Sequence, residues 1–122
     1  MKSIRSIALV LALCAPLAFA SGAGDKHFKG EPAETLPQAV KNFSAYNQKL
    51  EAILNGKVDD SAMADIHILT YTLENALHKM NEEMAQLAET LEKVHKASEK
   101  LDREGVVSNG REYLKVSREI IR

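Results

Sequence analysis

The 122-residue chain is poor in the residues that mark several protein classes. It has one cysteine, no tryptophan, six glycines and three prolines. A disulfide scaffold needs paired cysteines, and collagen-like or low-complexity chains need far more glycine and proline. The chain also lacks the basic excess typical of a nucleic-acid module, because 16 lysines and arginines oppose 17 aspartates and glutamates. The composition that remains favours one small helical domain without nucleic-acid partners.

Residues 1–20 have the layout of a secretory signal peptide. Lys2 and Arg5 form a positive start, and an apolar run of 13 residues follows from Ile7 to Phe19. That run is too short for a membrane-spanning helix, which needs about 20 residues. We therefore expect an exported protein, located in the periplasm, with no membrane anchor after processing.

The expected cleavage site lies between Ala20 and Ser21, because Ala18 and Ala20 supply the small residues that signal peptidases require. Cys14 raises the alternative of a lipoprotein, but the bulky Leu13 before it disfavours lipid attachment. Cleavage removes Cys14, so the mature chain would have no thiol for redox chemistry, haem attachment or zinc binding.

The mature chain divides into an arm and a helical domain. Residues 21–34 are rich in glycine and hold one large apolar side chain, Phe28, which predicts a flexible arm. Residues 35–122 predict an all-α fold, a coiled-coil-like bundle. Capping residues, glycines and apolar spacing place its helices at about residues 35–55, 60–104 and 108–121.

The second helix has a long heptad pattern, in which apolar residues recur at alternating steps of three and four. Thr70 and Ser98 are the polar breaks in it. The pattern predicts a coiled-coil seam formed by Met63, Ile66, Leu73, Leu77, Met80, Met84, Leu87, Leu91, Val94 and Leu101.

A short turn should fold the first two helices into an antiparallel hairpin. Pairing residues whose numbers sum to 116 or 117 aligns their apolar rows and sets Asn47 against Thr70. Two polar side chains that face each other in an apolar seam can hydrogen-bond and fix its register.

One stripe of the second helix offers metal ligands, because His67, Glu74 and His78 lie at helical spacing with Tyr71 among them. One stripe supplies few convergent ligands, so a solvated flank of the seam is the favoured interpretation. A haem site is the related alternative, because some exported bundles hold haem between a methionine and a histidine on separate helices. Here, however, three of the four histidines fall on the same helix as the methionines that could be ligands. We expect no cofactor.

The segment from Ile66 to Leu77, IHILTYTLENAL, resembles the core signature of a family of small exported bacterial helical proteins of unknown function. The resemblance implies an exported helical protein and carries no activity. It directs attention to His67, Thr70, Tyr71, Leu73 and Glu74.

No catalytic motif is present, so the sequence predicts a non-enzymatic structural or interaction protein; the alternative is a small metal- or haem-binding bundle. The short third helix should leave Met84 and Leu87 uncovered unless Phe28 packs there. The expected partner is therefore a second copy, as an antiparallel dimer, or another helical protein. Three further residues widen the apolar face, namely Ala62, Leu69 and Ala76.

Overall fold

The structure, a computed structural model, describes residues 28–121, so the expected signal peptide and the first part of the arm lie outside the described residues. Three helices follow in order, α1 (Leu36–Leu54), α2 (Asp60–Glu99) and α3 (Arg103–Ile120). The described residues contain no strand, which confirms the all-α fold class.

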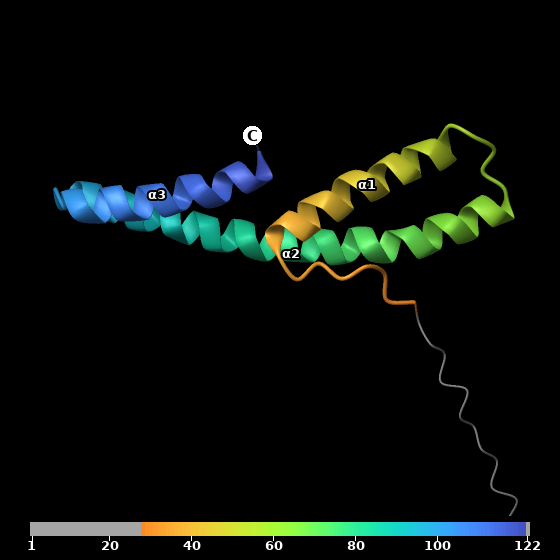
Figure 1. The fold of residues 1–122 in the computed structure, drawn as a ribbon, viewed down its shortest axis with the longest axis horizontal. Coiled ribbons are helices and arrows are strands. Elements are labelled where there is room, and N and C mark those ends of the chain that lie inside the picture. Colours follow the sequence, from red (N-terminus) through yellow and green to blue (C-terminus); the bar gives the residue numbers. More distant parts are fainter. Residues whose placement is uncertain (1–27, 122) are drawn as a thin grey trace, which may run out of the picture.

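The long α2 is the central helix, against which the other two pack, and its 40 residues span about 60 Å. Both α1 and α3 fold back antiparallel onto it, and they lie nearly end to end along its length (Figure 1). The molecule is therefore two consecutive helical hairpins that share one helix. None of the helices within residues 28–121 has the length and apolar character needed to cross a membrane.

The start of α1 has the expected capping box. The Thr35 hydroxyl accepts a hydrogen bond from the Gln38 amide at 3.4 Å, and the Gln38 side chain accepts one from the Thr35 amide at 3.2 Å. These bonds satisfy amides that the first helical turn leaves without partners. At the other end, α1 stops one residue before Asn55, close to the expected boundary.

The boundary between α2 and α3 differs from the expected one, because α2 ends at Glu99 and not near residue 104. The helix closes with two hydrogen bonds, from the Leu101 amide to the Ser98 carbonyl and from the Asp102 amide to the Ala97 carbonyl. This is a Schellman motif. Its left-handed position, with φ of 59°, holds Leu101 where glycine is usual.

The next helix begins at once, so the expected start of α3 near residue 108 is also wrong. Asp102 caps α3 by accepting a hydrogen bond from the Gly105 amide at 2.9 Å. Gly105 lies in the first turn of α3, close to the end of α2. A side chain has little room there, because a Cβ at residue 105 would lie 3.1 Å from the Cβ of Ala97. With 18 residues, α3 reaches far enough along α2 for Leu87 to be buried.

The buried seam of α2 is rotated from the expected one. From Ile66 to Val94 every second expected position is buried or half-buried, and the alternate positions are replaced by the residue just before them. Leu69 replaces Thr70 and Ala76 replaces Leu77, while Leu77 is 44 % exposed. Alanines at the contact, such as Ala39 of α1 and Ala76, let helix axes approach closely, so the larger side chains are turned outward.

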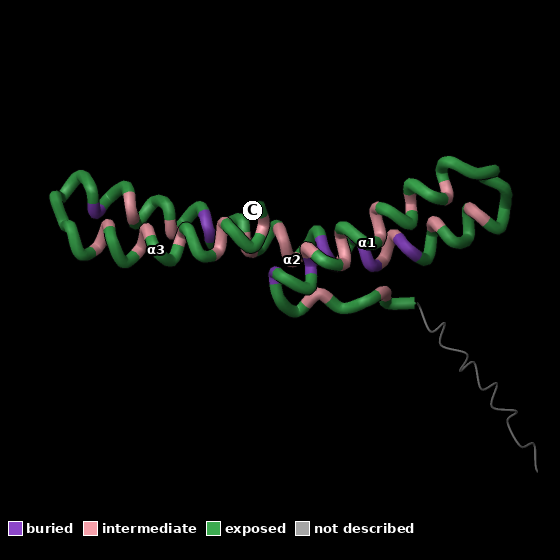
Figure 2. The backbone as a smooth tube through the Cα atoms, turned by 45° about the horizontal axis from the view of Figure 1, so that its top comes forward, coloured by how far each residue is buried: buried purple, intermediate pink, exposed green. Residues whose placement is uncertain are grey.

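The rotation leaves large apolar residues of α2 exposed to solvent. Exposed stretches recur along all three helices in Figure 2. Five of the expected seam residues are exposed, namely Met63, Leu77, Met84, Leu91 and Leu101. The other five, which are Ile66, Leu73, Met80, Leu87 and Val94, are buried or half-buried.

Candidate functional site

The arm is docked on α2 over residues 28–34, which corrects the expectation of a flexible segment for that part of it. The Glu31 amide donates a hydrogen bond to the Thr72 hydroxyl at 3.0 Å. The Asn75 side-chain amide donates to the carbonyls of Lys29 at 2.8 Å and of Glu31 at 3.0 Å. Thr72 has no exposed surface, so the first of these bonds is shielded from water.

Gly30 lets the arm lie directly against the backbone of α2. Its φ is +69°, in the left-handed region, and a Cβ there would come within 2.7 Å of the Thr72 nitrogen and 2.8 Å of the Tyr71 carbonyl carbon. The arm is also bound to α1, because the Asn42 side chain donates a hydrogen bond to the Pro32 carbonyl at 3.1 Å. The arm therefore ties the two helices of the first hairpin together.

Three aromatic rings line up where the arm meets α2. Phe28 packs edge-on against Tyr71 with ring centroids 6.2 Å apart, and Tyr71 packs against His67 at 5.1 Å. The Tyr71 hydroxyl lies 3.2 Å from His67 Nε2, within hydrogen-bond distance. Because Phe28 packs here, it does not cover Met84, which was the alternative to a partner that the sequence left open.

The candidate metal ligands are not brought together. His67 is bonded to Tyr71, and His78 Nε2 lies 3.2 Å from a carboxylate oxygen of Glu82. Glu74 is exposed. Within residues 28–121, no three histidine, cysteine, aspartate or glutamate side chains are grouped as ligands of one ion.

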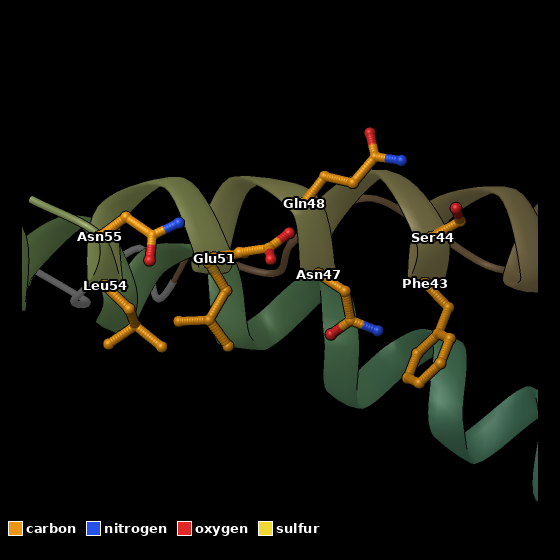
Figure 3. A pocket seen from close by; sticks show the side chains of 8 residues that line it. Phe43, Ser44, Asn47, Gln48, Glu51, Leu54 and Asn55 are labelled. Atoms are coloured by element: carbon orange, nitrogen blue, oxygen red, sulfur yellow. The ribbon is translucent and has the colours of Figure 1, made fainter.

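The expected hydrogen bond between Asn47 and Thr70 is not formed. Thr70 Oγ1 donates instead to the His67 carbonyl of its own helix at 2.8 Å. Asn47 and Phe43 extend from α1 toward α2 on the side of the hairpin away from the arm, whereas Gln48 points away (Figure 3). The pair thus lies at the edge of the buried seam and not within it.

Four of the exposed apolar residues, Met63, Leu77, Met84 and Leu91, belong to a second face of α2, which we call the outer face. Its ten residues follow one another at alternating steps of four and three, so they form a continuous strip along the helix. All are exposed except Thr70, which is half-buried. The outer face consists of Met63, His67, Thr70, Glu74, Leu77, Asn81, Met84, Ala88, Leu91 and His95.

Charge is nearly absent from the outer face, where Glu74 is the one carboxylate among residues with no lysine or arginine. The charged residues of α2 lie elsewhere around the helix and pair with one another. Lys79 Nζ lies 2.7 Å from Glu83, and this hydrogen bond raises the pKa of Lys79 above its usual value. Lys96 Nζ lies 3.2 Å from Glu92. Surface helices normally spread such charges over all solvated positions, so a strip with a single charged residue is distinctive.

These features define a small all-α protein built on one long helix, with an arm on one side and an apolar face on another. The whole chain, residues 1–122, matches the model of the family of unknown function DUF6746, and it belongs to that family. No curated protein and no solved structure matches it.

Sequence reasoning missed the residues that hold the arm, Gly30, Thr72 and Asn75. Thr72 and Asn75 lie one helical turn apart within residues 66–77, so they share a side of α2. The available signal for arm binding was a threonine and an asparagine among apolar residues, together with a glycine in the preceding arm. It was weak because the binding partner is backbone, which carries no sequence pattern.

Proposed function

We propose that this protein is exported and acts, without enzymatic activity, as a structural or protein-interaction module through the outer face of α2. The observation that carries the proposal is the strip of large apolar side chains that neither α1, α3 nor the arm covers. Leu77, Met84 and Leu91 follow one another every seven residues, Met63 lies two such steps before Leu77, and the four are 44–57 % exposed. Apolar residues scattered singly over a surface are ordinary, whereas a contiguous apolar strip is typical of a binding surface.

The chemistry of the strip suits another helix as the partner. Apolar positions at steps of seven form one of the two rows of a coiled-coil contact, and here the second row, four residues on, is mostly polar. Burial of apolar surface is worth about 25 cal/mol per Å², so covering four such side chains is favourable. The near absence of charge reduces the desolvation cost of forming that contact.

A photo-reactive benzophenone side chain placed at single positions tests this role in the native compartment. We expect a label at Met84 to yield covalent adducts with protein on irradiation. Ala85 provides the matched control, because it is the next residue and is exposed outside the outer face. The absence of protein adducts at Met84, or equal adducts at both positions, would remove the support for an interaction role.

Export to a bacterial periplasm belongs to the same proposal and rests on residues 1–20. The supporting features are the positive start, the short apolar run and the small residues at Ala18 and Ala20. Intact mass spectrometry of the protein from the exported fraction is expected to give the mass of residues 21–122. A mass that includes residues 1–20, or a lipid adduct on Cys14, would contradict it.

A further inference from the structure

We propose that the outer face of α2 binds the outer face of a second copy of this chain, antiparallel, around a two-fold axis between Leu77 and Asn81. The inference rests on the proposed interaction role and names its partner. A two-fold dimer places one surface against itself, so the surface must be complementary to its own reversed copy. Three properties of the outer face meet this requirement: its direction, its distribution of charge and its area.

The direction of the outer face suits a four-helix assembly. The inner seam, which includes Leu69 and Leu73, faces α1. With about 3.6 residues per turn, the outer face is rotated by about 100° from that seam. Viewed along the axis of α2, a second α2 packed there and α1 would therefore lie in directions that are nearly perpendicular to each other. Two hairpins joined in this way give the square cross-section of a four-helix bundle.

Charge decides between the two orientations of the second copy. In a parallel pair, Glu74 of each chain would face its equivalent, and like charges directly opposed are destabilising. In the antiparallel pair, facing residues have numbers that sum to 158. In this register the two outer faces overlap over their whole length, from Met63 to His95. Glu74 then faces Met84 of the second copy, and the two carboxylates lie about 15 Å apart along the axis.

In the remaining layers of that register, an apolar or small side chain faces a polar one. Leu91 faces His67 of the second copy, Thr70 faces Ala88, and Leu77 faces Asn81. The two layers with Asn81 flank the axis, where each amide lies beside the Asn81 of the other chain. An asparagine amide both donates and accepts, so two of them can bond across a two-fold axis and specify the register.

The area of the surface reaches the lower limit of a specific protein interface. From Met63 to His95 the strip is about 50 Å long, and a helix contact about 10 Å wide gives about 500 Å² per copy. The flank of α1 beside it adds to this area, because Asn47 and Leu54 extend from α1 on the side away from the arm (Figure 3). For the strip alone, the two copies bury about 1,000 Å² in total, which is at the lower limit of a specific protein interface.

Sedimentation equilibrium of the protein, produced from its full coding sequence, measures the association. We expect a dimer at about 10 μM, and we expect Leu77→Glu to weaken dimerisation at least 100-fold. Two buried carboxylates would then lie next to the axis, one from each chain. Ala85→Glu adds the same side chain outside the outer face and should leave the dimer intact. Circular dichroism establishes that both variants keep their helices.

Spin labels distinguish the antiparallel dimer from other assemblies. His78 and Glu92 are exposed on the same side of α2, outside the outer face, so cysteines there can be labelled in a Cys14→Ser background. The antiparallel register places two labels at residue 78 a few ångström apart along the axis and two at residue 92 about 40 Å apart. Dipolar electron spin spectroscopy should therefore give a much longer distance for residue 92.

Each alternative outcome overturns a stated part of the inference. Equal distances at both positions would indicate a parallel pair. A strict monomer at about 100 μM, with no dipolar signal, would refute the second copy as partner. If the benzophenone at Met84 still captured another protein, the interaction role would survive without self-association. If it captured nothing, both proposals would fail.

Discussion

The two hairpins of this molecule share α2, and yet they are packed very differently. Among the described residues, six of the eight buried ones belong to the α1–α2 hairpin, whereas the α2–α3 hairpin has Leu87 and Ala97. None of the residues of α3 is buried (Figure 2). The helices of the two hairpins are similar in length, since α1 has 19 residues and α3 has 18.

What separates the hairpins is the third layer. The arm lies across the first hairpin, where Gly30 and Glu31 contact α2 and Pro32 is bonded to α1. The second hairpin consists of two helices, and two helices in contact leave each other's flanks open to water. A short stretch of extended chain is therefore enough to change a marginal pair of helices into a small core.

The largest effect in this comparison is expected from Leu73→Ala in the first hairpin. Leu73 and Leu87 are both 8 % exposed, so Leu87→Ala is a matched substitution in the second hairpin. We expect Leu73→Ala to lower the free energy of unfolding by about 3 kcal/mol and Leu87→Ala by about 1–2 kcal/mol. The loosely held α3 can collapse onto the smaller side chain, whereas the clamped first hairpin cannot.

Urea denaturation measures both losses, and hydrogen exchange locates them. Leu87→Ala should increase exchange mainly in α3, since that helix can open without disturbing the first hairpin. Equal losses of stability, with exchange raised uniformly along α2, would mean that the two hairpins form one cooperative unit.

An effect of intermediate size is expected from Gly30→Ala, which removes the difference between the hairpins by releasing the arm. The added Cβ would meet backbone atoms of α2, and the left-handed φ of +69° disfavours alanine. We expect a loss of about 1–3 kcal/mol and rapid hydrogen exchange of the Glu31 amide.

Gly110 of α3 provides the control for that substitution, because no atom lies within 4 Å of the position of its Cβ. Gly110→Ala should raise stability by about 0.5–1 kcal/mol, since alanine favours the helix interior. Retained protection of Glu31 in Gly30→Ala would show that the arm does not depend on this close approach.

The smallest effect is expected from Leu101→Gly, which strengthens the weaker hairpin. Leu101 is 76 % exposed and adopts a φ of 59°, so glycine should relieve the backbone with little loss of packing. We expect a gain of about 1 kcal/mol in urea denaturation, accompanied by slower hydrogen exchange in α3. A lower stability would indicate that the leucine side chain contributes more than its backbone conformation costs.

The sequence predicted the class of fold and the order of the helices, because apolar periodicity records these directly. It did not predict which side of each helix faces inward. Met63 and Leu77 are larger than the neighbouring Ala62 and Ala76, and a pattern judged by size selects them for the core. The closest helix contacts use the smaller residues, so half of the predicted seam lies one residue from the real one.

The arm and the second turn escaped prediction for a different reason. Both depend on backbone conformation, and the residues that allow it are few. Leu101 adopts a conformation that glycine usually provides, so the real end of α2 had no local marker, and Gly105 supplied a false one. Asn75 binds two carbonyl oxygens of the arm, and carbonyl oxygens are present in every segment.

The shared helix has a consequence for the order in which the chain folds. Every buried residue of the first hairpin lies between Leu36 and Ala76, and the arm that clamps it comes earlier still. A chain that emerges from its N-terminus can therefore complete its best-packed half once residues up to about Met80 are free. The remaining part of α2 then extends from a finished template, and α3 joins last through contacts close in sequence, which form quickly.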